Sequence, residues 1–190
     1  MGRAQKSAVA AAMLPALLGL ALLGTAGSAH AGVSAPGRPA APQAVGAVRY
    51  VKNLYTGKCL TVNEQGTANG EKVNQYTCVG QTNQKWQFIN RQGTFFYELK
   101  NVKSGKCLDD PGFSQKNGTQ LDQWTCNGGW NQWWVEDFGR QANTFEAVKP
   151  PLGSYLYLGI SGGSKANNAP AIIWNTGSAK NEAWNISIPG

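Results

Sequence analysis

Residues 76–86 read YTCVGQTNQKW, residues 124–134 read WTCNGGWNQWW, and residues 174–184 read WNTGSAKNEAW. Each stretch begins with an aromatic residue, carries an Asn three positions before its end, and closes on a Trp. The first two copies are 48 residues apart and the last two are 50 apart. A period of this length is typical of units that bury their apolar faces against their neighbours. The sequence therefore predicts three homologous repeats.

The segments between these stretches have the pattern of an all-β domain. Short runs rich in β-branched and aromatic residues are separated by turn formers, and no sustained helical periodicity follows the N-terminal segment. Phe95–Leu99 is predicted as a strand, Ser104–Lys106 as a turn, and Cys107–Leu108 as the next strand. Asn69-Gly70 and Asn117-Gly118 predict hairpin turns of the primed type. With four strands in each repeat, we expect about twelve short strands.

The first two repeats share a Gln-x-Trp ending, Gln84-Lys85-Trp86 and Gln132-Trp133-Trp134. Together with the third copy, this pattern resembles the ricin-B-type lectins, over about residues 48–189. The resemblance implies a β-trefoil of three repeats, in which a six-stranded barrel capped by three hairpins leaves no open sheet edge. In that fold we expect the repeated tryptophans to be core anchors of the cap; they are Trp86, Trp134 and Trp184.

The N-terminal segment has the parts of an export signal. Arg3 and Lys6 precede an apolar run from Ala8 to Leu23, and Ala29-His30-Ala31 matches a small-x-small cleavage site. We therefore expect residues 1–31 to be a signal peptide and the protein to be secreted.

The remaining chain divides into two parts. Residues 32–47 are rich in Ala and Pro and are interpreted as a linker or tail. Residues 48–190 form the predicted lectin domain, in which no segment is apolar enough to span a membrane. The net charge is +7, and the Lys and Arg residues are scattered singly, which argues against a nucleic-acid partner. The oligomeric state is left open.

The four cysteines form two equivalent pairs, each separated by 19 positions. An even number in an exported protein argues for disulfides. Three connectivities are possible, and the repeat favours Cys59–Cys78 and Cys107–Cys126, one bond inside each of the first two repeats. The third repeat has Tyr157 and Thr176 at these positions, so we expect it to open most easily.

The resemblance also implies a sugar pocket in each repeat, and the second repeat carries the full set of residues. Asp109 would accept two hydrogen bonds from neighbouring sugar hydroxyls, and Trp124 would stack on the sugar ring. Asn131 would bond a further hydroxyl, while Gln132 would hold the Asp109 side chain in place. Asn127 is a further contact on the same rim. Turn capping is the alternative role for Asp109 and Asn131.

The other two repeats depart from this set. The first is a weaker candidate, with Thr61 in place of the Asp and with Tyr76, Asn83 and Gln84 retained. The third retains Trp174 and Asn181, but Gly159 replaces the Asp and Glu182 replaces the Gln. Because the orienting carboxylate is missing in both, we expect the second pocket to be the main site.

The sequence offers little for catalysis. His30 is the only His and leaves with the signal peptide, so the mature chain has no His for a triad or a proton shuttle. The cysteines lack Cys-x-x-Cys spacing, and neither a metal nor a cofactor is expected. The acid pairs Asp109-Asp110 and Glu136-Asp137 are the residue type that a glycosidase uses. However, Asp109 is assigned to binding, and the other acids are interpreted as solvated turn residues.

The sequence therefore predicts a secreted, non-catalytic β-trefoil lectin. The resemblance suggests galactose, N-acetylgalactosamine, lactose or xylan-type ligands. The alternative is a β-trefoil that binds proteins through its loops, as a protease inhibitor or toxin-delivery subunit does. Mutation of Asp109 distinguishes the two, since only a lectin would lose its function there.

Overall fold

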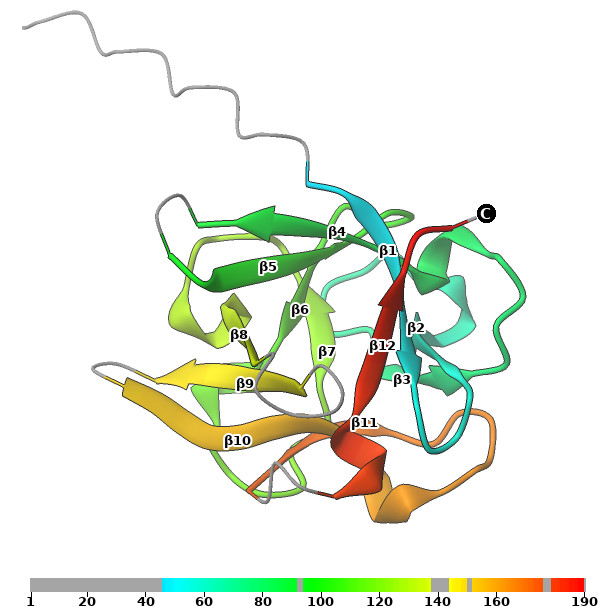
Figure 1. Cartoon of the computed structure of the whole chain (residues 1–190). Helices are drawn as coiled ribbons and strands as arrows, with labels where there is room; N and C mark the ends of the chain where they lie inside the picture. The colour runs from blue at the N-terminus through cyan, green and yellow to red at the C-terminus, as the bar shows by residue number, and fades with distance from the viewer. Residues whose placement is uncertain (1–45, 92–93, 138–143, 150–151, 176–178, 190) are drawn as a thin grey trace, which may run out of the picture. The chain divides into compact units, whose positions relative to one another are not determined.

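The computed structural model describes residues 46–91, 94–137, 144–149, 152–175 and 179–189 (Figure 1). Within this part of the chain the regular elements are strands and short 3-10 helices, and four strands fall in each repeat as predicted. The strands are β1 (Val48–Asn53), β2 (Cys59–Val62), β3 (Val73–Tyr76), β4 (Lys85–Asn90), β5 (Phe96–Asn101), β6 (Cys107–Asp109), β7 (Asp122–Trp124), β8 (Trp134–Asp137), β9 (Thr144–Lys149), β10 (Leu152–Ile160), β11 (Ala171–Trp174) and β12 (Trp184–Ser187). The 3-10 helices are η1 (Asn63–Gln65), η2 (Thr82–Gln84), η3 (Pro111–Phe113), η4 (Trp130–Gln132), η5 (Ser161–Gly163) and η6 (Lys180–Glu182).

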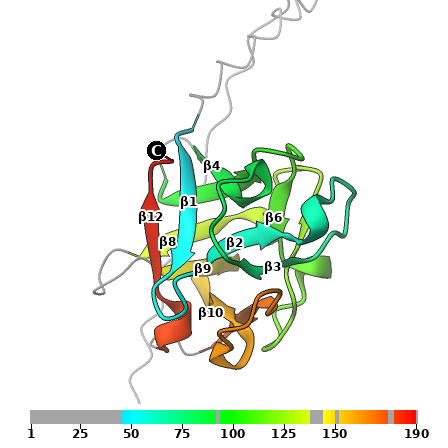
Figure 2. The ribbon, with the colours of Figure 1, turned by 90° about the vertical axis from the view of Figure 1, so that its right-hand side faces the viewer.

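The strands form one antiparallel ladder from which three hairpins project. Its order is β12, β1, β4, β5, β8 and β9, so the last strand of the chain pairs with the first (Figures 1 and 2). The hairpins are β2–β3, β6–β7 and β10–β11, one from each repeat. Isolated bridges join them pairwise, through Lys72 with Asp122, Asn74 with Pro170, and Gln120 with Ile172. This barrel with a cap of three hairpins is the predicted β-trefoil.

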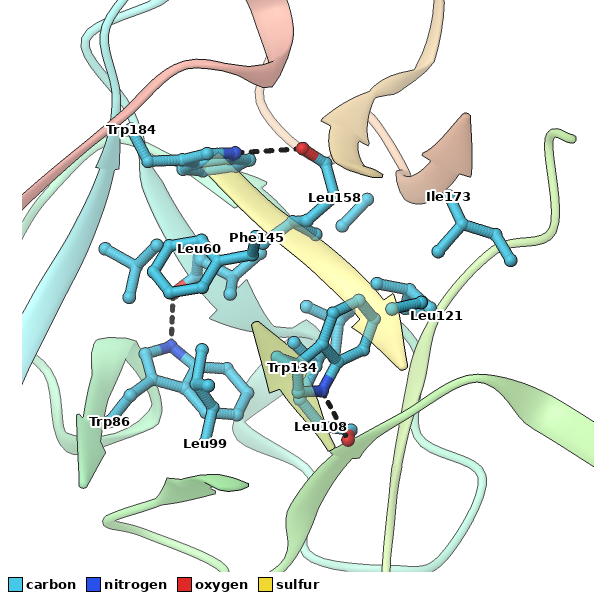
Figure 3. Close-up of a cluster of buried hydrophobic side chains, with 14 of the residues drawn as sticks. Leu60, Trp86, Leu99, Leu108, Leu121, Trp134, Phe145, Leu158, Ile173 and Trp184 are labelled. Atoms are coloured by element: carbon cyan, nitrogen blue, oxygen red, sulfur yellow. Dashed lines mark hydrogen bonds between the residues drawn. The ribbon is translucent and has the colours of Figure 1, made fainter. Parts of the chain in front are cut away.

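Three tryptophans anchor the core in the same way. Trp86, Trp134 and Trp184 are buried, and each indole Nε1–H donates a hydrogen bond to a backbone carbonyl in the hairpin of its own repeat (Figure 3). The acceptors are Leu60, Leu108 and Leu158, at 3.0, 3.3 and 2.9 Å. A buried indole gains apolar burial while its N–H remains bonded. The prediction that these residues are core anchors is confirmed.

The predicted primed hairpin turns are wrong. β2 ends at Val62 and β3 begins at Val73, so a long loop rather than a two-residue turn joins them. Gly70 lies in this loop with a φ of +83°, and Asn168 takes +63° at the matching place in the third repeat. The glycine signal therefore marks a left-handed position, which glycine adopts without strain. It does not mark the tip of a two-residue hairpin.

The disulfides have the predicted pairing. Cys59 bonds Cys78 and Cys107 bonds Cys126, with Cα atoms 5.2 and 5.1 Å apart. Each bond joins the first residue of a hairpin to the second residue beyond its end. It therefore closes the segment that contains the loop between the two hairpin strands, which we call the cap loop of that repeat. In the third repeat, Tyr157 is buried and pairs with Trp174 across β10 and β11.

The predicted signal peptide and all but the last two residues of the predicted linker lie outside the described residues, as does Thr176. In the part of the chain that the structure covers, no helix has the length and apolar character needed to cross a membrane.

Candidate functional site

Each repeat presents an exposed aromatic ring and an Asn side chain beside a surface hollow. The last residue of the second hairpin strand is aromatic, and its ring is well exposed: 37% for Tyr76, 43% for Trp124 and 41% for Trp174. An Asn then follows in the short 3-10 helix before the core Trp, and the first hairpin strand faces both. Exposed large aromatic rings at three related positions indicate a repeated binding surface, since the fold does not need them for its core.

In the second repeat, Asp109 is fixed by two amide groups. The Nδ2 of Asn131 donates to Oδ2 of Asp109 at 2.7 Å, and the Nε2 of Gln132 donates to the same oxygen at 2.8 Å. No described residue donates to the other oxygen, Oδ1, which remains available to a ligand. The carboxylate is therefore held in one orientation by groups from η4.

Gln132 is itself held by the backbone. Its Nε2 also donates to the carbonyl of Thr125 at 3.0 Å, and its Oε1 accepts from the N–H of Asn127 at 2.9 Å. The side chain of Asn127 lies on the pocket rim, where its Oδ1 accepts from the N–H of Gly129 at 2.8 Å. The structure thus brings the predicted second-repeat residues together around a hollow of about 230 Å³.

Gly129 is a residue that the sequence analysis missed. A Cβ at this position would lie 2.5 Å from Oδ1 of Asn131, so a side chain here would displace that amide. The equivalent residues in the other repeats, Gln81 and Ala179, carry side chains. In those repeats the side-chain amide that matches Asn131 donates to a backbone carbonyl instead. Nδ2 of Asn83 donates to the carbonyl of Val62, and Nδ2 of Asn181 donates to that of Ile160.

The electrostatics of Asp109 suit a buried acceptor. Burial raises the pKa of its carboxyl, while the hydrogen bonds from Gln132 and Asn131 oppose that shift. A carboxylate that has lost part of its hydration gains more from bonding a ligand hydroxyl than one that stays in water. The arrangement can bind a hydrogen-bond donor beside the apolar face of Trp124.

The first pocket lacks such a carboxylate. Thr61 is buried, and its hydroxyl donates to the carbonyl of Cys59 at 2.7 Å while accepting from Nε2 of Gln84 at 3.3 Å. The hollow of about 390 Å³ is also lined by Tyr76 and Asn83. Oδ1 of Asn83 is buried and has no partner among the described residues. The first pocket therefore keeps Tyr76, Asn83 and Gln84 but lacks the orienting acid.

The third pocket is rearranged. A Cβ on Gly159 would lie 2.9 Å from Cγ of Glu182, so the glutamate fills the space that an Asp would use. Oε2 of Glu182 accepts from the N–H of Ala179 at 3.3 Å. The hollow is about 650 Å³, with Trp174 and Tyr55 in its lining. From the sequence, Glu182 is expected only to replace the glutamine that orients the acid. The structure shows that its side chain packs against Gly159.

Two further acids near the second pocket are buried. Asp110 is 0% exposed and Asp122 is 5% exposed, so the interpretation of Asp110 as a solvated turn residue is wrong. Oδ2 of Asp110 accepts from both the backbone N–H and the side-chain Nε2 of Gln115, at 3.2 and 3.3 Å, which holds the loop after η3. Glu136 is only partly exposed as well. The side chain of Asp137 lies outside what the structure describes.

Asp122 lines the pocket together with Asp109. It lies two residues before Trp124 on β7, and residues two apart on a strand face the same side. Strand alternation is therefore the signal that would have identified it in the sequence.

A trefoil with an exposed aromatic ring and an amide at each of three related pockets is the architecture of a lectin-like domain. The sequence profile described as "Ricin-type beta-trefoil lectin domain-like" matches residues 43–96 and 82–174, more than half of the chain. The chain belongs to this family. A comparison with curated proteins found no match.

Solved structures have the same fold. The designed three-fold symmetric protein ThreeFoil has 28% sequence identity and a TM-score of 0.68, over 74% of this chain and 97% of its own. An exo-β-1,3-galactanase from Clostridium thermocellum has 27% identity and a TM-score of 0.65, over 74% of this chain but 30% of the enzyme. The Macrolepiota procera ricin B-like lectin, solved with lactose, has 20% identity and a TM-score of 0.62, over 78% of this chain and 100% of the lectin.

Proposed function

We propose that this protein is a secreted, non-catalytic lectin that binds galactose-type or xylan-type glycans mainly through its second pocket. The observation that carries the proposal is the fixed carboxylate of Asp109 beside the exposed ring of Trp124. Two amides orient Oδ2, and Oδ1 remains for the ligand. A sugar offers what this surface accepts: hydroxyl donors for the carboxylate and a C–H face for the indole.

Two comparisons support a galactose-type ligand. The galactanase acts on a galactose polymer, and the Macrolepiota procera lectin was solved with a galactose-containing disaccharide. The pocket is small and open, so the dissociation constant of a single site should be about 0.1–1 mM. Secretion is supported by the charged start, the apolar run and the small-residue cleavage site of residues 1–31.

A glycan array probed with the chain from residue 32 onward tests the proposal. Multivalent display is needed, because a weak single site is detected only when several sites bind at once. Binding to glycans that end in galactose, or to xylan fragments, is the expected result. No binding to any glycan would overturn the lectin assignment and favour a β-trefoil that binds proteins through its loops.

A further inference from the structure

The second pocket differs from the other two in carrying two carboxylates. Asp109 on β6 and Asp122 on β7 are direct cross-strand partners. The corresponding pairs are Thr61 with Asn74 in the first repeat and Gly159 with Ile172 in the third. Like charges opposite each other on a sheet destabilise the pairing. Since neither other repeat carries this pair, the fold does not require it.

Asp122 has one bonded oxygen and one unbonded oxygen. Nζ of Lys72, from the neighbouring repeat, lies 3.2 Å from Oδ2. Oδ1 is buried and has no partner among the described residues, although Asp122 lines the pocket. A buried carboxylate oxygen without a donor carries a desolvation cost that a ligand donor would relieve.

The charges around Asp122 leave the pocket negative. Burial is the main cause of the raised pKa of the Asp122 carboxyl, Lys72 opposes the shift, and Asp109 and Asp110 add to it. The carboxylates of Asp109, Asp110 and Asp122 therefore outnumber the single ammonium group of Lys72. The exposed face of Trp124 at the same pocket attracts cations as well.

We propose that the second pocket prefers sugars that carry a free, protonated amine, because Asp122 acts beside Asp109 as a second carboxylate facing the ligand. The inference rests on the proposed sugar site and names the class of sugar that it selects. A sugar ammonium group supplies both a positive charge and three donors. It can bond Oδ1 of Asp122 while a neighbouring hydroxyl bonds Asp109. An acetylated amine offers neither the charge nor the full set of donors.

Titration calorimetry of the full domain tests this preference with three galactose derivatives and their glucose counterparts: the neutral sugar, the free amino sugar and the N-acetylated sugar. At about pH 6.5 an amine whose pKa is near that of an α-amino group stays protonated. EDTA in the buffer removes free metal ions. We expect the amino sugar to bind about tenfold more tightly than its neutral counterpart, because charged hydrogen bonds are the stronger ones. The preference should weaken as salt is added.

Two variants assign the effect to Asp122. Asp122→Asn places at this position the residue that the first repeat has there, Asn74, so the hairpin should fold normally. It should abolish the preference for the amine, so that the amino sugar binds the variant no more tightly than its neutral counterpart. Lys72→Gln removes the opposing charge and should increase the preference.

The possible outcomes separate the two proposals. Equal affinity for charged and neutral sugars would overturn the amine preference and leave the sugar site standing. A preference that survives Asp122→Asn would also overturn it. If no sugar of either series binds, the galactose-type site and the inference built on it both fail.

Discussion

The side-chain amide of Gln132 donates a hydrogen bond of 2.8 Å to Oδ2 of Asp109, the oxygen that also accepts from Asn131 at 2.7 Å. In the first repeat the matching amide, that of Gln84, donates to the hydroxyl of Thr61 in place of a carboxylate, at 3.3 Å. The same orienting group is thus present in both repeats, but it meets a carboxylate in one of them. This relationship distinguishes the proposed site from its weaker copy.

Gln132→Ala should shift the pH dependence of sugar binding. The hydrogen bond from Gln132 opposes the rise in the pKa of Asp109 caused by burial. Without it the pKa rises further, so Asp109 protonates at a higher pH as the solution is acidified. The midpoint at which affinity is lost on acidification should therefore move upward, as measured by calorimetry across the acidic range. Gln84→Ala, the matched change in the first pocket, should leave that midpoint in place.

Thr61→Asp should create a second sugar site. Tyr76, Asn83 and Gln84 already surround the position, and Oδ1 of Asn83 lacks a partner. The stoichiometry in calorimetry should rise from one sugar to two. Gly159→Asp is the control in the third repeat: its Cβ would meet Glu182 at 2.9 Å, so no site should form. An unchanged stoichiometry in Thr61→Asp would mean that the pocket needs more than the acid.

Gln75→Ala should loosen the cap loop of the third repeat. Nε2 of Gln75 donates to the carbonyls of Ser164 and Ala166, at 2.7 and 2.9 Å, and this contact holds the loop that has no disulfide. Losing it leaves two carbonyls without their partner and should cost about 1–3 kcal/mol. Hydrogen exchange should accelerate across residues 159–171, which we expect to open first in the wild type as well.

The cap loop of the second repeat provides an internal comparison. Ile173 occupies the place that Gln75 and Gln123 hold in the other repeats, so no such amide contacts this loop. Hydrogen exchange in the cap loop of the second repeat should not change in Gln75→Ala. Equal acceleration in both loops would indicate global destabilisation instead of a local anchor.

Glu136→Gln should remove a pH-dependent loss of stability. Burial raises the pKa of the Glu136 carboxyl from 4.5 to about 7, against the opposing charge of Arg49. The folded protein therefore keeps a proton that the unfolded chain has released between these values, and stability falls as the pH rises through this window. Above this pH window the full loss of stability remains.

The variant should match the wild type at about pH 4 and be about 1–3 kcal/mol more stable at about pH 8 in urea unfolding. The equivalent positions hold Phe88 and Ile186, so the site accepts an uncharged side chain. As a control, Arg49→Gln should shift the pH at which stability is lost to a higher value, because Arg49 favours the ionised form of Glu136. An equal gain in stability at both pH values would rule out the ionisation of Glu136 as the cause.

The repeat alignment predicted much of the fold. It placed the core tryptophans and the disulfides correctly, because packing and crosslinks inside a unit recur with the repeat. The resemblance to the lectin family grouped Asp109, Asn131 and Gln132, because these residues keep fixed positions within one unit. Contacts that only one repeat makes were not accessible in this way, because the other two repeats do not show them.

Asp122 illustrates the limit. Its importance comes from pairing with Asp109 across the hairpin and from Lys72 of the preceding repeat. Strand alternation places Asp122 on the same face as Trp124, but it does not predict the contact with Lys72. Asp110 is a second case: it occupies the position of the core residues Val62 and Ile160, and only its bonds to Gln115 explain how an acid is accommodated there.

The most direct test of the account is calorimetry of lactose or xylo-oligosaccharide binding by the wild type and by Asp109→Asn. The substitution keeps the shape and removes the charge and one acceptor, so it should cost about 1.5–3 kcal/mol and make binding undetectable. Trp124→Ala should do the same, Trp174→Ala in the third pocket should not, and circular dichroism should remain native in all three. Intact binding in Asp109→Asn would contradict the account and assign the activity to another pocket.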